Sequence, residues 1–557
     1  MNNRNVFALA YKPLVAAVFL NGLAASVYAQ VPPDAGTILQ QLQPTLPSSP
    51  PSSAPSLQTQ PKTNTTLPES APFFVRQLRI TGNTVFPTEA LHGLISGEEG
   101  KSLTLRQVGD LAGRITAFYQ NQGYQLTRAI IPAQTIRDGV VTIQVIEAHY
   151  GKVQLDNQSE VRDSLLQSTI APLHSGSVID DGSLNRSLLL LSDIPGVGVA
   201  ATLKPGSDVA TSDLTVAANQ NPSAFANVSL DNYGNKYTDR ERLSANFNVL
   251  NPLHLGDVLS ATLLTTGSGM NYGRVSYEAL INGQGTRAGA SYSYLRYRLG
   301  ENISDLDANG TAMVGSAWVR HPLMRSRSAN VYVQAQFDRK QLDDRIDATD
   351  LRTDRHLDNW VLGLNGDLRD DVLAGAINLW SVGVTSGRVV FDNVNTAAQA
   401  QGSFSKFNLN LSRLQGLTSS NALYVNVAAQ WSDVNLDSAE KMTIGGPYSV
   451  RAYDIGALSG DTGYAGTVEL RHDLGSGPLG YWQAIAFVDS AYVRVNRHPT
   501  TNAENSGNLS GIGVGLNWRG PDQWQGALSV ANRLGSEPSL VADQSPVRGW
   551  VTISKAF

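Results

Sequence analysis

The sequence contains no cysteine among its 557 residues. This absence excludes a disulfide framework and any metal site built on thiolates. Charged residues make up only 16% of the chain, whereas about a quarter is usual in soluble proteins. The net charge of -5 gives no indication of nucleic-acid binding. After the first 29 residues no apolar run reaches about 18 residues, so the sequence predicts no membrane-spanning helix there.

A leader peptide is the first feature that the sequence does contain. Arg4 and Lys12 supply positive charge, residues 14–20 form a short apolar core, and residues 27–29 fit a small-x-small cleavage site. A membrane anchor is the alternative, but the apolar run is shorter than the about 20 residues that span a bilayer. We therefore expect residues 1–29 to be a cleaved signal peptide. The mature protein is then periplasmic, secreted or an outer-membrane β-barrel.

Residues 30–72 have the composition of a linker, because Pro, Ser, Gln and Thr dominate and too few apolar residues occur to build a core. One short helix is predicted inside this stretch, at residues 35–42, with Asp34 as its N-cap. Its apolar residues share one face: Ile38, Leu39 and Leu42. The alternative is a helix that forms only transiently in a disordered arm. Our hypothesis is a detachable plug helix on a long tether.

Two α+β units follow, at residues 73–148 and 149–219, and both are predicted to run strand-helix-helix-strand-strand. The elements predicted in the first unit are strands at 75–80, 129–131 and 140–146, a helix from Pro87 to Ile95, and a helix at 105–121. The elements predicted in the second unit are strands at 152–155, 199–203 and 214–218, a helix at 161–170, and a helix capped by Asp180 that runs to Leu191. A plain α+β spacer remains the alternative to a binding module.

Residues 220–557 show the alternation of transmembrane β-strands. In residues 423–431 and 511–518, apolar side chains alternate with polar or small ones, as in an outer-membrane barrel. At roughly 20 residues per strand and connection, this region predicts a barrel of about 16 strands, wide enough for an aqueous channel unless something fills it. A soluble β-sandwich is the alternative. The last residue, Phe557, ends a predicted strand.

One long loop is unusual, because it is rich in glycine yet carries an arginine between apolar and aromatic residues. Its distinctive residues are Gly445, Gly446, Pro447, Val450, Arg451, Tyr453, Gly460, Asp461 and Gly463. The first interpretation is a surface loop with a solvated arginine. The second is a loop folded into the barrel, with Arg451 meeting a carboxylate on the wall. Asp489 in the strand at 486–491 should face the lumen, because a charge facing lipid is costly, and a buried Arg451 needs such a partner.

These features together resemble the outer-membrane transporters of two-partner secretion, the type Vb or TpsB family (ShlB/FhaC/HecB-like). The loop from Gly445 to Tyr453, continued at residues 459–464, carries the most specific similarity. Residues 230–235 look like the family's first barrel strand and turn, and residues 412–417 look like a strand that precedes the loop. The two α+β units resemble POTRA domains. The resemblance covers nearly all of the mature chain.

The resemblance implies particular roles for several residues. The long loop would enter the barrel, Arg451 would pair with Asp489 of a wall motif that includes Phe487, and Phe557 would be the assembly signal of an outer-membrane protein. Two departures from the family pattern are Ala452, where a glycine usually follows the arginine, and Ala491, where a glycine often follows the aspartate. Both alanines are small, so we expect the loop tip to fit.

The resemblance also implies a function and its partners. An unfolded TpsA-like exoprotein would be captured by strand addition to the POTRA domains in the periplasm, and exported through the barrel after the plug leaves. The other expected partners are outer-membrane lipid and the barrel-assembly machinery, with no nucleic acid, no cofactor and no metal. The passenger class stays open: an adhesin, a haemolysin, a haem-scavenging protein or a contact-dependent inhibition toxin.

Enzymatic chemistry is not indicated by any motif. No Gly-x-Ser-x-Gly elbow lies between a strand and a helix, and the eight histidines are scattered. The acidic run from Asp343 to Asp354 lacks the spacing of a calcium loop, and we predict a solvated extracellular loop there. Two rival functions remain, a barrel-assembly insertase of the same superfamily and a passive porin or receptor. The rivals explain less, because insertases usually carry more POTRA units without a plug and a porin needs no periplasmic domains.

Overall fold

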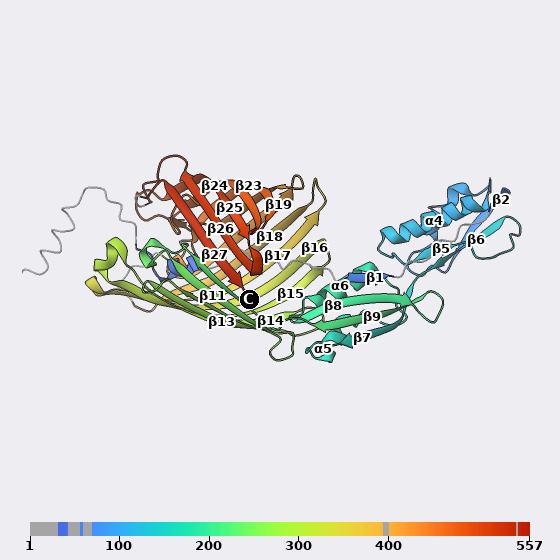
Figure 1. Ribbon diagram of the computed structural model, residues 1–557, viewed down its shortest axis with the longest axis horizontal. Helices are drawn as coiled ribbons and strands as arrows, with labels where there is room; N and C mark the ends of the chain where they lie inside the picture. Colours follow the sequence, from blue (N-terminus) through green and yellow to red (C-terminus); the bar gives the residue numbers. More distant parts are fainter. Residues whose placement is uncertain (1–31, 43–55, 60–68, 394–399, 542–543) are drawn as a thin grey trace, which may run out of the picture.

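The computed structural model describes residues 32–42, 56–59, 69–393, 400–541 and 544–557. A β-barrel lies at one end of the molecule, the second α+β unit lies beside it, and the first α+β unit lies at the far end (Figure 1). The predicted signal peptide at 1–29 and most of the predicted linker lie outside the described residues. In the described parts of the chain, no helix has both the length and the apolar character needed to cross a membrane.

Within the described residues, sixteen antiparallel strands close into a barrel, as the sequence predicts. The strands are β10 (Ala224–Asp231), β11 (Arg242–Leu250), β12 (Val258–Thr265), β13 (Met270–Leu280), β14 (Arg287–Arg298), β15 (Ala308–Arg325), β16 (Ala329–Ile346), β17 (Leu351–Asp370), β18 (Ala376–Phe391), β19 (Gly402–Gly416), β20 (Asn421–Ser432), β23 (Thr462–Gly477), β24 (Gly480–Arg494), β25 (Ser506–Arg519), β26 (Trp524–Arg533) and β27 (Val547–Ala556). The barrel closes where Asn227–Asp231 of β10 pairs with Thr552–Ala556 of β27. The backbone of Phe557 then bonds to that of Ala226, which extends the same seam.

The alternation of the strands separates a lipid face from a lumen face. On β20, Val427 and Trp431 are 40% and 48% exposed on the outside, whereas Gln430 is 5% exposed and faces inward. On β25, Ile512 and Val514 also face outward. Apolar residues therefore form the outer band of the barrel and polar residues line its interior, which is the arrangement of a transmembrane barrel.

The first α+β unit has a small three-stranded sheet covered by its longest helix. Its elements are β2 (Phe73–Val75), β3 (Gln77–Thr81), α3 (Thr88–His92), a 3₁₀ turn (Ser96–Glu98), β4 (Lys101–Leu103), α4 (Leu105–Asn121), β5 (Arg128–Ile130) and β6 (Val140–Ile146). The predicted strand at 75–80 is split, because the N–H groups of Arg76 and Gln77 both bond to the carbonyl of Gly139. β2 then pairs with β4, a strand that the sequence analysis missed. The helix predicted from Pro87 to Ile95 ends at His92.

A buried carboxylate fastens this unit. Glu147 accepts hydrogen bonds from the backbone of Thr84 and Val85 and from the hydroxyl of Tyr119. Burial alone would raise the pKa of Glu147, but these hydrogen bonds outweigh it and lower the pKa. The carboxylate is therefore held ionised, and it ties the chain before α3 to the end of β6.

The second α+β unit has the predicted order strand-helix-helix-strand-strand, without a counterpart of β4, and takes up an additional strand. Its elements are β7 (His149–Asn157), α5 (Asp163–Ile170), α6 (Asp181–Ser192), β8 (Val197–Pro205) and β9 (Thr211–Gln220). Asp180 caps α6 by accepting a bond from the N–H of Ser183, as predicted. The linker segment β1 (Ser56–Thr59) pairs in parallel with β8, so that the sheet runs β1-β8-β9-β7 (Figure 1). The predicted linker therefore contains a strand that the sequence did not reveal.

Contacts from α6 hold the second unit against the barrel rim. Arg325, at the end of β15, makes a two-pronged ion pair with Asp193 just after α6, with N–O distances of 2.7 and 2.8 Å. Arg186 of α6 donates to the carbonyl of Pro322 in the same rim segment. The unit is therefore fixed beside one mouth of the lumen.

Candidate functional site

The connection between β20 and β23 folds into the barrel. It contains a 3₁₀ turn η5 (Ser438–Glu440) and the short hairpin strands β21 (Met442–Ile444) and β22 (Leu458–Gly460). Gly445 and Gly446 have φ values of +96° and +99°, which only glycine adopts without strain. A β-carbon on Gly445 would lie 2.5 Å from the carbonyl oxygen of Asp454. These two glycines turn the chain back on itself, and the loop tip beyond them is buried.

Arg451 at this tip meets the barrel wall. Its Nε and Nη2 lie 2.9 Å from Oδ2 and Oδ1 of Asp489, and its backbone N–H lies 3.1 Å from Oδ2. Its Nη1 lies 2.6 Å from Oε2 of Glu469 on β23. The guanidinium carbon lies 3.2 Å from the ring centre of Phe487. We call Arg451, Glu469, Phe487 and Asp489 the loop anchor. Two carboxylates and an aromatic face surround one arginine, which is the pairing that a buried guanidinium requires.

Asp489 and Phe487 lie where the sequence predicts them, but two other partners of Arg451 were not predicted. Glu469 shares the inward face of β23 with Thr467, and that alternation could have identified it. Trp550 of β27 donates its indole N–H to the carbonyl of Arg451 at 2.7 Å. No local pattern marks this contact, because Trp550 lies 99 residues along the chain. The tip therefore touches the strand that closes the barrel.

The two departures from the family glycines are accommodated differently. The methyl group of Ala452 lies over Gly511 of β25, where an added β-carbon would stand 2.6 Å from it. Gly511 is the direct cross-strand partner of Asp489. The absence of a side chain at Gly511 therefore gives Ala452 its space. Ala491 is buried in β24 between Ala465 and Leu509 of the neighbouring strands.

The remaining motif residues shape the loop. Pro447 begins a turn closed by a bond from the N–H of Ser449 to the carbonyl of Gly446. The carboxylate of Asp461 is buried; it accepts bonds from two backbone N–H groups and pairs with Lys441 at 2.8 Å. The other members lie in close packing: Val450 and Tyr453 in the buried tip, and Gly460 and Gly463 against the backbone of β24. None of these residues forms a second ionic contact to the wall like that of Arg451 among the interactions of the described residues.

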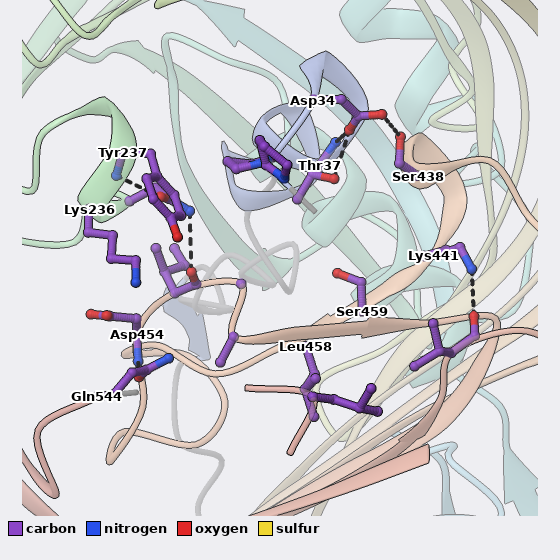
Figure 2. Close-up of a pocket in the computed structure, with 18 residues that line it drawn as sticks. Asp34, Thr37, Lys236, Tyr237, Ser438, Lys441, Asp454, Leu458, Ser459 and Gln544 are labelled. Carbon is purple, nitrogen blue, oxygen red and sulfur yellow. Dashed lines mark hydrogen bonds between the residues drawn. The ribbon is translucent and has the colours of Figure 1, made fainter. Parts of the chain in front are cut away.

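The helix α2 (Ala35–Leu42) lies inside the barrel, as the dark blue helix of Figure 1 shows. Its apolar residues Ile38 and Leu39 pack against lumen-facing leucines of β14, β16 and β17. Asp34 caps the helix by accepting a bond from the N–H of Thr37 at 2.8 Å. Figure 2 shows Asp34 also reaching across to Ser438 of the inward loop, whose hydroxyl donates to it at 2.6 Å. The helix is therefore a plug held by both the wall and the loop.

Arg355 on β17 is the charged centre of this plug site. Its three nitrogens contact three carboxylates, those of Asp34 at 2.8 Å, Asp344 at 2.6 Å and Asp437 at 2.7 Å. Asp34 belongs to the plug, Asp344 to the wall and Asp437 to the loop. We call Asp34, Asp344, Arg355, Asp437 and Ser438 the plug seat.

The plug seat corrects one expectation from the sequence. The acidic run from Asp343 to Asp354 is only in part a solvated loop. Asp347 and Asp350 lie in an exposed turn, as predicted, but β16 continues to Ile346 and β17 resumes at Leu351, so Asp343, Asp344 and Asp354 lie on strands. Asp344 faces the lumen, where it also accepts a bond from the N–H of Ala35 at 2.8 Å. The alternation of Lys340, Leu342 and Asp344 on one face could have revealed this.

The turn η5 ties the plug to the wall. Glu440 pairs with Lys340 at 2.6 Å and with Lys406 at 2.8 Å. On its other side, η5 packs so closely on α2 that a β-carbon on Gly36 would lie 2.4 Å from the hydroxyl oxygen of Ser438. The plug, the loop and the wall therefore meet at one point.

Cavities remain around the plug. One of about 370 Å³ lies between the start of α2, the β10–β11 connection and the loop (Figure 2). Others of about 400 and 480 Å³ border Gln40 and the barrel wall below it. Across the described ranges, no group of three histidine or acidic side chains is arranged to hold a metal ion. The site has the features of a plugged channel.

Comparison with known proteins agrees with this architecture. Residues 210–518 match the family described as haemolysin secretion/activation protein ShlB/FhaC/HecB, and residues 73–148 match the ShlB-type POTRA domain. The chain belongs to the ShlB/FhaC/HecB family. It is therefore an outer-membrane transporter of two-partner secretion, with its POTRA domains in the periplasm. The resemblance, fold class, localisation and transport function predicted from the sequence are confirmed.

Individual relatives support the assignment to the ShlB/FhaC/HecB family. The heme/hemopexin transporter protein HuxB of Haemophilus influenzae is 27% identical over 492 residues, which cover 86% of each chain. The outer membrane transporter CdiB of Dickeya dadantii is 22% identical over 466 residues, covering 80% of this chain and 81% of CdiB. The solved structure of CdiB from Escherichia coli has a TM-score of 0.73 at 20% identity, covering 89% of this chain and 93% of that chain. That structural likeness supports the fold.

Proposed function

We propose that this transporter captures one large unfolded exoprotein with its periplasmic domains and exports it through the barrel after α2 leaves the lumen. One observation carries the proposal: a helix that is not part of the barrel strands lies inside a polar-lined barrel and is held there by side-chain contacts. Export needs no catalytic step, since folding of the passenger outside the cell can draw it forward.

The strand β1 supports capture by strand addition. It is a short extended segment that adds in parallel to β8, so this edge of the second unit accepts extended backbone. An exoprotein segment that displaced β1 in the same conformation would make the same ladder of backbone hydrogen bonds. The first domain has a comparable edge at β5, which pairs on one side only among the described strands.

The loop anchor and the plug seat supply the two gating contacts in this proposal. Arg451 paired with Asp489 keeps the inward loop in place, and the loop in turn presents Asp437 and Ser438 to the plug. Export then requires the plug to release Asp34 from Arg355. The C-terminal Phe557 acts earlier, as the assembly signal read by the barrel-assembly machinery, and outer-membrane lipid surrounds the apolar outer band.

The relatives suggest which passenger to look for first. HuxB is named as a heme/hemopexin transporter and CdiB as an outer membrane transporter. Since the HuxB match has the higher identity of the two, a large haem- or hemopexin-binding exoprotein is the first passenger to test. Nucleic acid has no place in this function.

The decisive experiment compares the culture supernatants and outer-membrane proteomes of wild-type and deletion strains. We expect one large secreted protein to disappear from the supernatant while other barrel proteins remain. A general fall in many barrel proteins would instead identify an insertase. An unchanged pair of proteomes, under conditions in which the candidate exoprotein gene is expressed, would leave a porin or receptor.

A further inference from the structure

The lumen wall between the plug and the periplasmic rim differs in chemistry from the rest of the interior. Its side chains on β16, β19 and β20 are mostly amides, namely Gln334, Gln336, Asn408, Asn410, Asn426 and Gln430. Hydroxyls and small residues of β18 complete the lining of the 480 Å³ cavity here. The charged residues of that lining lie where the cavity meets the inward loop: Lys406 pairs with Glu440, and Lys441 pairs with Asp461.

The amides of this wall bond to one another. Asn408 donates to Gln430 at 2.9 Å, and Asn426 donates to Asn410 at 3.0 Å. Gln334 donates to Gln336 at 2.9 Å. Each amide side chain carries a donor and an acceptor, which are the same groups that a peptide unit carries. A bond between two such side chains can therefore be exchanged for a bond to a passing peptide unit with little change in energy.

The opposite wall continues the same chemistry. On β11 and β12, Asn246 accepts from the hydroxyl of Thr262 at 2.8 Å, and Asn248 accepts from the hydroxyl of Ser260 at 2.7 Å. Two charged side chains of opposite sign stand among these groups: Arg274 of β13, which donates to Ser291, and Asp338 of β16, which accepts a bond from Gln336 at 2.8 Å. The other ionic groups named above gather at the plug seat, the loop anchor and the rim. Neutral hydrogen-bonding groups thus predominate on both sides of the passage that leads up to the plug, and its two charges offset each other.

We propose that these amides form a neutral track that binds the exoprotein as an extended chain through its peptide groups and does not select for its side-chain charge. The inference rests on the proposed export function and adds the chemistry by which the lumen receives its substrate. A wall that carried charges of one sign would concentrate counter-ions and hold oppositely charged passenger segments. A neutral wall lets acidic and basic segments pass alike.

Ion selectivity tests the track without the exoprotein. Open-channel events of the full-length protein in planar bilayers under a KCl gradient give the ratio of K⁺ to Cl⁻ permeability, and Asp34→Ala can be added to make such events frequent. We expect a ratio within about twofold of one, because a neutral lining focuses neither ion. The double substitution Asn408→Asp with Asn410→Asp should raise the ratio by at least about threefold, and the same positions changed to Lys should lower it.

Export provides the second measurement. The Asp and the Lys double substitutions should both reduce the amount of exoprotein in the supernatant by at least about fivefold, since charges of either sign would retain oppositely charged segments of the exoprotein. The matched control is Thr501→Asp with Asn502→Asp, on an exposed loop between β24 and β25, which should change neither reading. Equal amounts of inserted barrel must be shown by heat-modifiable mobility.

Three results would overturn the neutral track. They are a strongly ion-selective wild-type channel, a double substitution that shifts the selectivity yet exports normally, and an unchanged ratio of K⁺ to Cl⁻ permeability in both double substitutions. Failure of the export function itself would look different. In that case wild-type cells would secrete no dependent protein, while the permeability ratios would still be measurable.

Discussion

The loop anchor and the plug seat each contain one arginine and several carboxylates. In the anchor the arginine lies on the inward loop, whereas in the seat it lies on the barrel wall. At the anchor, Arg451 belongs to the loop, and its carboxylates, Asp489 and Glu469, belong to the wall. At the seat, Arg355 belongs to the wall, and the plug contributes only Asp34. The loop therefore contributes the arginine to the anchor, whereas the plug contributes only one of the three carboxylates to the seat.

This difference decides what is left behind when each element leaves. If the plug leaves, Arg355 still contacts Asp344 and Asp437, so this buried arginine keeps two of its three carboxylate partners. If the loop leaves, Asp489 loses its only cation among the contacts of the described residues. Leaving a buried charge unpaired is costly. The comparison indicates a plug built to detach and a loop built to stay.

Arg451→Ala should have the largest effect. It leaves Asp489 and Glu469 without their shared arginine, which corresponds to about 3–5 kcal/mol against the docked loop. We expect the barrel to insert normally, the exoprotein in the supernatant to fall at least about tenfold, and the channel conductance to change. Asp489→Ala should behave alike. Secretion and single-channel recordings measure these effects.

The matched control for this change is Arg345→Ala, which removes an exposed arginine from the end of β16. It should export as the wild type does. Normal export by both Arg451→Ala and Asp489→Ala would remove the loop anchor from the mechanism, and the comparison would fail with it.

Arg355→Ala should come next, because it leaves Asp34, Asp344 and Asp437 together without their common cation. Like charges at such short range repel, so we expect the plug to be expelled and the channel to be open most of the time. Bilayer recordings and sensitivity of cells to large antibiotics measure this opening. A channel that stays closed would show that the apolar face of α2 alone holds the plug.

Sequence reasoning found the anchor but not the seat, and the reason is physical. Alternation identified the barrel strands because each has one lipid face, and it placed Asp489 in the lumen for the same reason. The loop motif then supplied Arg451. At the seat, Asp34 was recognised only as a helix cap. Its partner Arg355 lies 321 residues away, and a contact over that distance leaves no local pattern.

The prediction for the acidic run before Arg355 was wrong at Asp343 and Asp344 for a second reason. Asp343 and Asp344 look like part of a solvated loop when read as a cluster, but they lie on β16, which continues to Ile346. Read with period two, Leu342 and Asp344 fall on the lumen face and Asp343 on the other. The same approach would have placed Glu469 beside Asp489. Contacts such as that of Trp550 with Arg451 depend on barrel closure and could not be predicted.

Gly511→Ala tests the fit of the loop tip without removing a charge. The added methyl would overlap with that of Ala452, and such overpacking costs about 1–3 kcal/mol. We expect export to fall roughly fivefold or more. The double variant Ala452→Gly with Gly511→Ala should recover export, because the contact would again hold one methyl group, now on β25 instead of on the loop tip. A double variant as defective as Gly511→Ala would show that Gly511 is needed for another reason.

Asp34→Asn should have the smallest effect, and it separates the two roles of this residue. Asparagine still caps a helix well, so the substitution removes mainly the ion pair with Arg355. Because the Asp34 side chain is about one-third exposed, the loss should be about 1 kcal/mol or less. We expect plug opening to become at most about fivefold more frequent, and this difference should shrink at high salt.

Asp34→Ala removes the cap as well and should open the channel more often than Asp34→Asn at every salt concentration. If Asp34→Asn instead opened the channel as fully as Arg355→Ala, the plug would depend on this one ion pair. The seat would then be as indispensable to the plug as the anchor is to the loop.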